Sequence, residues 1–371
     1  MWRLNLVSSL HQTQSKPITT RIHESFAEVE IMIKEEKARN LPCGFVRCGI
    51  VLAAGDGRRL RSFIRRFRGN ALPKQYVNFF GTRSLLEQTF RRVEKLIAPE
   101  CLFTIISEGH LRYLDVRRQI ECRSEKTVIV QPENKDTGPG LLLPLIHLAK
   151  RYPASVVAVF PSDHFIAEED SFMDHVASAF RYAERNPSRL VLLGIQPREP
   201  ESEYGYILPG PPVENSPSEE FRTVLKFIEK PRPHTAHALI QKGGLWNSLV
   251  MVFRLKTMLD LMALCAPDIY LAYKRIEEAI GTSVEYDVVE SVYAEMPSMN
   301  FSKGILENLS QQYQAHLAVL SVASVSWSDW GSEHRVLKDL RRLGYLNPLE
   351  EIGQSKENGI GNQPRNFKIV L

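Results

Sequence analysis

Short apolar segments alternate with helix-like stretches through the part of the chain that follows residue 46. Each segment is five or six residues long and largely apolar, which predicts strands that are buried on both faces. These expected strands are Gly49–Ala53, Leu102–Ser107, Thr127–Gln131, Val156–Phe160 and Leu190–Ile195. Apolar residues at helical spacing predict helices over Ser84–Ala98, Pro139–Lys150 and Phe172–Ala183. The alternation predicts an α/β fold with a mainly parallel sheet and helices on both faces.

The alternation changes after about residue 200, where the expected strands are separated by shorter helical stretches. These strands are Tyr204–Leu208, Val224–Ile228 and Leu249–Phe253. The polar, proline-rich stretch 209–220 predicts an exposed connection of a hairpin. The sheet is therefore expected to be mixed rather than wholly parallel.

Three parts of the chain differ in character. Residues 1–46 predict an N-terminal helical extension, because apolar residues recur at helical spacing between Ile22 and Ile33. Residues 47–345 are expected to form the α/β domain. Residues 346–371 are rich in Gly, Asn and Gln, which predicts a mobile C-terminal tail.

Charge and cysteine content argue against several classes of protein. The net charge of the 371 residues is +4, and residues 58–68 alone hold six arginines. Nucleic-acid binding is the rival explanation of that cluster, but no recognition-helix, zinc-finger or RNP pattern accompanies it, so a small anionic ligand is favoured. The five cysteines are scattered without a Cys-x-x-Cys pair, which favours reduced thiols in a cytoplasmic protein. No apolar stretch approaches the ~18 residues of a membrane span.

A cationic glycine loop follows the first expected strand. Gly55 and Gly57 form a Gly-x-Gly pair, and Arg59 and Lys74 lie shortly after it. Such a loop can bring backbone N–H groups close to phosphate oxygens, and the cations add charge for a triphosphate. The loop is not a P-loop, because the pattern Gly-x-x-x-x-Gly-Lys-Ser/Thr is absent. It is not a dinucleotide fingerprint either, because Leu60 replaces the third glycine. A tight strand-to-helix turn is the alternative interpretation.

Asp163 follows the expected strand Val156–Phe160 and is the strongest single candidate for chemistry. A carboxylate at the carboxyl end of a parallel strand faces the same crevice as a loop that follows a neighbouring strand. Mg²⁺ prefers one or two carboxylates, with phosphate and water completing its shell. The alternative is an Asx-turn or a helix N-cap. His164 is a poor Mg²⁺ ligand and is expected to be structural or orienting.

Four later positions have polar or small residues of the kind found at sugar-phosphate sites. Lys230 ends a strand and could bind a phosphate, although a surface salt bridge is the alternative. Glu229 could accept hydrogen bonds from sugar hydroxyls or could simply be solvated. Gly205 between two tyrosines indicates close approach of a ligand or of another backbone segment, and Asn247 offers both a donor and an acceptor.

Taken together, these segments resemble the sugar-1-phosphate nucleotidyltransferases, specifically the mannose-1-phosphate guanylyltransferase family. The resemblance covers about residues 47–340. The matching motifs, in family order, are Leu52-Ala53-Ala54-Gly55-x-Gly57-x-Arg59-Leu60, Pro73-Lys74-Gln75, Gln131-Pro132-Glu133-Asn134, Pro161-Ser162-Asp163-His164, Tyr204-Gly205-Tyr206-Ile207, Phe227-Ile228-Glu229-Lys230-Pro231, Trp246-Asn247-Ser248 and Ser328-Asp329.

The resemblance implies a Rossmann-like, glycosyltransferase-A-type nucleotidyltransferase domain over residues 47–345. It implies transfer of a nucleotidyl group from a nucleoside triphosphate to a sugar 1-phosphate with release of pyrophosphate. The favoured pair is GTP and mannose 1-phosphate, which give GDP-mannose. Arg59 and Lys74 would stabilise the leaving pyrophosphate, Lys230 would position the sugar phosphate, and Asp163 and Asp329 would hold Mg²⁺.

The resemblance also assigns two sets of binding residues. The expected nucleotide-binding residues are Leu52, Ala53, Ala54, Gly55, Gly57, Gln131, Pro132 and Glu133. The expected sugar-binding residues are Gly205, Glu229, Lys230 and Asn247. No strong base is needed for this reaction, because a sugar phosphate oxygen is already anionic.

Three residues depart from the family pattern. Arg58 stands where relatives have Thr or Ser, Leu249 stands where they have Gly, and Lys303 stands where they have Asp. Because of these departures, another nucleotide and sugar pair and a non-catalytic regulatory paralogue are kept as alternatives. A homo-oligomer is left open.

Overall fold

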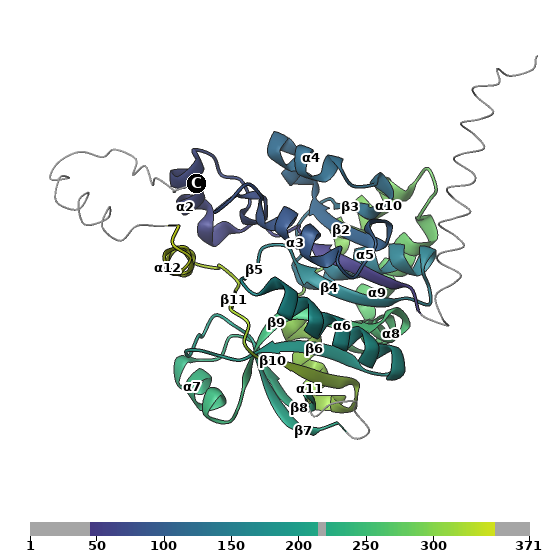
Figure 1. Ribbon diagram of the computed structural model, residues 1–371. Helices are drawn as coiled ribbons and strands as arrows, with labels where there is room; N and C mark the ends of the chain where they lie inside the picture. Colours follow the sequence, from purple (N-terminus) through teal and green to yellow (C-terminus); the bar gives the residue numbers. More distant parts are fainter. Residues whose placement is uncertain (1–44, 214–219, 346–371) are drawn as a thin grey trace, which may run out of the picture. The chain divides into compact units, whose positions relative to one another are not determined.

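A nine-stranded sheet organises the residues that the computed structural model describes, which are 45–213 and 220–345 (Figure 1). Its strands are β1 (Arg47–Leu52), β2 (Leu102–Ser107), β3 (Val128–Gln131), β4 (Val156–Pro161), β6 (Leu190–Ile195), β7 (Tyr206–Pro212), β8 (Phe221–Ile228), β9 (Leu245–Arg254) and β10 (Leu317–Val322). The strand order is β3-β2-β1-β4-β9-β6-β10-β8-β7. Apart from residues 45 and 46, the expected helical extension lies outside the described residues, as does the expected tail.

Only β8 and β9 run against the other strands of this sheet. Neighbouring strands are parallel in the pairs β1–β2, β2–β3, β1–β4 and β6–β10. β9 is antiparallel to β4, β6 and β7, and β8 is antiparallel to β10 and β7. The expectation of a mixed, mainly parallel sheet is confirmed.

Two groups of helices cover the sheet. The helices are α2 (Arg61–Arg68), α3 (Leu85–Val93), α4 (Leu114–Glu121), α5 (Thr137–Arg151), α6 (Glu169–Arg185), α7 (Pro233–Gln241), α8 (Leu255–Cys265), α9 (Pro267–Ala279), α10 (Glu285–Glu295), α11 (Glu307–Gln312) and α12 (Glu333–Arg342). α5 packs on β1 to β3 and contacts α8 and α9, whereas α6 packs on β4, β6, β9 and β10 and contacts α3. Every residue of β2, β4 and β6 is buried, as expected for strands covered on both faces.

The carboxyl ends of β1 and β4 lie side by side. Leu52 pairs with Pro161 at the end of the ladder, and the Ser162 hydroxyl donates to the Leu52 carbonyl at 2.7 Å. The glycine loop that follows β1 and the Asp163 segment that follows β4 therefore emerge at the same edge of the sheet.

A small second sheet brings a distant part of the chain to this edge. It joins β5 (Phe165–Ile166) to β11 (Trp327–Ser328) in antiparallel pairing, with Phe165 opposite Ser328. Asp163 precedes β5 by two residues and Asp329 directly follows β11. The two-stranded sheet thus brings the segments of two aspartates that are far apart in the sequence to the same edge.

Several boundaries differ from the sequence expectation. β7 continues to Pro212, so the first part of the expected loop 209–220 is a strand. β9 begins at Leu245, four residues before the expected start, and β10 was not among the expected strands. A register shift between β6 and β9 explains the first of these two errors, because the irregularity lies between Asn247 and Met251 of β9 and interrupts the strand pattern around Leu249.

Candidate active site

The glycine loop is held in place by the segment that carries Lys74. The buried side chain of Gln75 donates to the carbonyl oxygens of Ala53 at 2.7 Å and Gly55 at 2.8 Å. The Tyr76 hydroxyl also donates to the Ala53 carbonyl, at 3.1 Å. These bonds satisfy carbonyl groups that have left the β-ladder, and they fix the loop while its opposite side faces the cleft.

Gly57 is the position of the loop that requires glycine. Its φ is +58°, and a Cβ there would lie 3.2 Å from the Lys74 backbone nitrogen and Cβ. A larger residue would be strained by the left-handed backbone and would push Lys74 away. The glycine therefore allows the loop to pack directly against the lysine.

Lys74 lies between the two aspartates. Its Nζ is 2.8 Å from Asp163 Oδ2 and donates to the backbone carbonyl of Asp329 and, at 3.4 Å, to that of Trp330. The Lys74 side chain is only 6% exposed. Lys74 is one of the cations expected to stabilise the leaving pyrophosphate. It thus contacts both residues that are expected to hold Mg²⁺.

Both aspartates are held in the ionised form. Burial would raise the pKa of Asp163, but the charge and the hydrogen bond of the Lys74 ammonium act against it, and the pKa lies below its ordinary value. Burial opposes ionisation of Asp329 as well, and Lys74 and Arg335 lower its pKa overall. Two adjacent carboxylates that stay charged at neutral pH are suited to a divalent cation.

His164 is neutral and oriented by a neighbouring indole. Trp327 Nε1 donates to His164 Nδ1 at 3.2 Å, and burial lowers the pKa of the imidazole to about 4. Because Nδ1 accepts, the ring proton is on Nε2, which lies 3.7 Å from Asp163 Oδ1. This arrangement fits the orienting role expected for His164.

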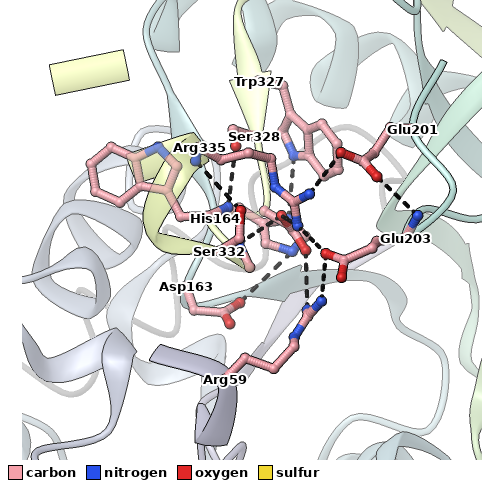
Figure 2. Close-up of polar contacts among 12 residues, drawn as sticks. Arg59, Asp163, His164, Glu201, Glu203, Trp327, Ser328, Ser332 and Arg335 are labelled. Carbon is pink, nitrogen blue, oxygen red and sulfur yellow. Dashed lines mark hydrogen bonds and ion pairs between the residues drawn. The ribbon is translucent and has the colours of Figure 1, made fainter. Parts of the chain in front are cut away.

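A network of arginines and carboxylates borders the aspartates (Figure 2). Arg59 Nη1 contacts Glu203 Oε2 at 2.7 Å, and Arg59 Nη2 lies 3.5 Å from Asp329 Oδ2. Arg335 of α12 contacts Glu201 at 2.7 Å, Glu203 at 2.6 Å and Asp329 at 3.1 Å. Glu203 and Arg335 were not among the expected site residues, and no motif in the sequence marks them.

The site is a cleft of two neighbouring lobes that share lining residues. One lobe has a volume of about 310 Å³ and the other of about 510 Å³, and Arg59, Lys74 and Asp163 line both. The first lobe is also lined by Gly205, Glu229, Lys230, Asn247 and Asp329. The second lobe is also lined by Asp56, Gly57, Arg58, Asn134 and Asp136. We call the first the sugar-side lobe, because the expected sugar-binding residues line it. We call the second the glycine-loop lobe.

Gly205 lies close to Glu229 and Asn247, two of the other expected sugar-binding residues. A Cβ there would lie 2.7 Å from Glu229 Oε2 and 3.3 Å from Asn247 Cβ. The Asn247 N–H donates to the Gly205 carbonyl at 2.8 Å, which ties β9 to this turn. Lys230 has a φ of +48°, and its ammonium is exposed 3.9 Å from Glu229 Oε1. All four residues expected at the sugar face one lobe.

The expected nucleotide-binding residues do not all line the cleft. Leu52, Gly55 and Gly57 line it, whereas Ala53 and Ala54 are buried beneath the loop. The segment 131–133 lies elsewhere: Gln131 is buried and accepts from the Tyr293 hydroxyl at 3.4 Å, Pro132 lines a different cavity, and Glu133 pairs with Lys135. The roles of these three residues stay predictions.

The three departures from the family pattern have different surroundings. Arg58 lines the glycine-loop lobe and pairs with Asp56 at 3.0 Å. Leu249 lines the sugar-side lobe with a φ of +57°, a conformation that costs a residue other than glycine about 1–2 kcal/mol. Lys303 is exposed and does not line either lobe.

Comparison with known proteins gives the family. The nucleotidyl transferase family matches residues 48–340. The chain belongs to this family. A mannose-1-phosphate guanylyltransferase of Salmonella montevideo is 30% identical over 288 residues, which are 76% of this chain and 58% of that protein. One of Escherichia coli is 28% identical over 285 residues with the same two coverages. This member of the nucleotidyl transferase family thus spans less than two thirds of those relatives.

Solved structures agree with the family assignment. A structure described as mannose-1-phosphate geranyltransferase from Thermus thermophilus aligns with a TM-score of 0.65 and 26% identity, covering 81% of this chain and 80% of that one. A protein described as mannose-6-phosphate isomerase from Helicobacter pylori has a TM-score of 0.58 at 20% identity, which shows the shared fold alone. It covers 76% of this chain and 100% of that one. The resemblance predicted from the motifs is confirmed.

Hydropathy gives one further finding about the described part of the chain. None of its helices combines the length and the apolar character that a bilayer-spanning helix needs.

Proposed function

We propose that the protein transfers a nucleotidyl group from a nucleoside triphosphate, GTP, to a sugar 1-phosphate, mannose 1-phosphate, and forms GDP-mannose and pyrophosphate. The main support is that Arg59, Lys74 and Asp163 line both lobes of one cleft, next to Asp329. The glycine-loop lobe suits a triphosphate and the lobe around Gly205 suits a hexose phosphate. The names of the relatives favour the guanosine and mannose pair.

The mechanism follows from the charges around the cleft. An oxygen of the sugar phosphate attacks the α-phosphorus, and the bond from that phosphorus to the bridging oxygen of the β-phosphate breaks, so pyrophosphate leaves with the electron pair. Arg59 and Lys74 face the triphosphate and neutralise charge that grows on the leaving group. Lys230 holds the attacking phosphate in line. No proton has to be removed from the nucleophile.

The donor set around Lys74 fits Mg²⁺. Within residues 45–213 and 220–345, no group of three or more His, Cys, Asp or Glu side chains is arranged to hold a metal ion. Mg²⁺ binds through only one or two carboxylates when substrate phosphates and water supply its other ligands. Asp163 and Asp329 would hold it, and it would supply charge neutralisation at the α-phosphate.

A pyrophosphate-release assay tests the proposal. The purified chain is incubated with Mg²⁺, each of the four common nucleoside triphosphates and a panel of hexose 1-phosphates. We expect the fastest release with GTP and mannose 1-phosphate. Turnover with another pair would correct the substrates but keep the reaction. Binding of GDP-mannose with no release for any pair would instead identify a non-catalytic regulatory paralogue.

Lys230→Ala should chiefly impair use of the sugar phosphate. The exposed ammonium acts as a single point charge on one phosphate, so we expect KM for the sugar 1-phosphate to rise about 10-fold, with KM for the triphosphate within about 2-fold of wild type. Lys226→Ala is the matched control, since Lys226 is an exposed lysine of β8 that does not line the cleft. An effect on the triphosphate alone would contradict the assignment.

Glu229 should make sugar binding depend on pH. Burial raises the pKa of Glu229, Glu307 and Asp136 raise it further, and the Lys230 charge opposes them. The ionised form accepts hydrogen bonds from hydroxyls, so KM for the sugar 1-phosphate should rise as pH falls through this raised pKa. The second ionisation of the substrate phosphate, near pH 6, affects wild type and Glu229→Gln alike. The difference between the two pH profiles therefore reports Glu229, and identical profiles would refute its role.

A further inference from the structure

One carboxylate oxygen of Glu203 forms ion pairs with two guanidinium groups. Oε2 is 2.7 Å from Arg59 Nη1 and 2.6 Å from Arg335 Nη2 (Figure 2). Charge-assisted bonds of this length are strong, and an oxygen between two cations stays ionised. Accordingly, the two arginines lower the pKa of Glu203 although burial alone would raise it.

The two arginines differ in how firmly they are held. Arg335 has a side chain that is 12% exposed, bonds to Glu201 and Asp329 as well, and lies 5.0 Å from the centre of the Tyr204 ring. The Arg59 side chain is 53% exposed, and its second contact, to Asp329, is 3.5 Å long. Arg335 is thus held by several contacts, whereas the more exposed Arg59 can change its ion-pair partner.

Gly331 allows the two guanidiniums to approach the same carboxylates. A Cβ at this position would lie 2.5 Å from Asp329 Oδ2 and 2.6 Å from the Nη2 atoms of both Arg59 and Arg335. Contacts this short would force the side chains apart. Glycine here leaves room for the three charged groups to lie together, and a Cβ would displace the ends of these side chains.

The position of Arg335 affects the charge balance at the glycine-loop lobe when Arg59 binds a triphosphate. In the free protein Arg59 is paired with Glu203, and a bound triphosphate would compete with that carboxylate for the guanidinium in an exchange of anionic partners. The exchange would leave an uncompensated carboxylate facing a polyanion, which is unfavourable in a partly buried site. Arg335 stays on the same Glu203 oxygen, so that carboxylate keeps one guanidinium partner.

We propose that Glu203 holds Arg59 in the free protein and releases it to the triphosphate, and that Arg335 is a positioning residue that keeps Glu203 paired with a guanidinium during the exchange. The inference rests on the proposed function, because it takes a nucleoside triphosphate as the ligand of the glycine-loop lobe. It adds residues that no family motif marks. Its subject is triphosphate binding, so it can be tested without turnover.

The test is calorimetric titration with GTP and Mg²⁺ in the absence of sugar phosphate. Arg335→Leu should weaken GTP binding about 10-fold, or ~1.4 kcal/mol, because Glu203 then competes fully for Arg59. Adding Glu203→Gln to Arg335→Leu should return the Kd to within about 3-fold of wild type. Glu203→Gln alone should tighten binding about 3-fold. Lys338→Leu is the control, since Lys338 of the same helix pairs with Glu199 at the surface.

The outcomes separate this inference from the proposed function. If wild type binds GTP but Glu203→Gln fails to restore binding to Arg335→Leu, Arg335 has only a structural role and the inference is wrong. If Arg335→Leu does not fold, Glu203→Gln alone decides, and weaker GTP binding by that variant overturns the inference. If wild type binds none of the nucleoside triphosphates, the proposed function fails and this inference fails with it.

Discussion

Asp163→Asn is expected to lower Mg²⁺-dependent pyrophosphate release about a thousandfold while the protein stays folded. Asparagine keeps the shape of the side chain but removes the charge that would hold the divalent cation at the α-phosphate, and loss of one such electrostatic contact has effects of about this size. The Asp163 side chain is about one-third exposed, so the substitution leaves no cavity in the core. Initial rates over a range of Mg²⁺ concentrations, with circular dichroism as the check of folding, measure both parts of this prediction.

Asp260→Asn is the matched control for that experiment. Asp260 of α8 forms an exposed i,i+4 pair with Lys256, and the same change of charge there should leave the rate within about 2-fold of wild type. A rate near normal for Asp163→Asn at saturating Mg²⁺ would refute its role as a metal ligand. A loss of rate together with a loss of secondary structure would instead show that the Lys74 contact is needed for folding.

The meeting of Asp163 and Asp329 shows what the sequence could and could not predict. Both residues were expected to hold one metal ion because each lies in a motif of the family. The mixed sheet explains only the place of Asp163, at the carboxyl end of β4. Asp329 reaches the same edge through the pairing of β5 with β11, each of two residues. Strands this short have no detectable periodicity, so their pairing cannot be predicted from local pattern.

The segment 131–133 and the Glu203–Arg335 pair show the limits of motif reasoning from opposite sides. Gln131, Pro132 and Glu133 match the family in sequence, yet they do not line either lobe of the described cleft. Glu203 and Arg335 match no motif, yet their side chains meet at 2.6 Å across 132 positions of sequence. A contact of such separation depends on where α12 docks, which is a property of tertiary packing.

Lys74→Met should lower both activity and stability. The substitution removes the cation between Asp163 and Asp329, so it leaves two neighbouring carboxylates in a largely buried site. Breaking a fully buried pair costs about 3–5 kcal/mol, but Asp163 is 34% exposed, so we expect about 2 kcal/mol, which lowers Tm by about 4 °C in a domain of this size. Pyrophosphate release should fall at least about 100-fold, because in the proposed reaction the leaving pyrophosphate would lose its buried cation.

The pH dependence of this stability loss distinguishes the electrostatic cause from a packing defect. In wild type the pKa values of both aspartates lie below their ordinary value, so their stabilisation is present at neutral pH and is lost as pH falls through those pKa values. In Lys74→Met burial and mutual repulsion should raise both pKa values, so the folded state binds protons more readily and the deficit in Tm should shrink between pH 7.5 and pH 5. Lys95→Met is the control, since Lys95 forms an exposed pair with Asp170 and should change Tm by less than about 1 °C. A deficit that is the same at both pH values would mean that Lys74 stabilises the fold through the packing of its alkyl chain, and the charge argument for the site would be wrong.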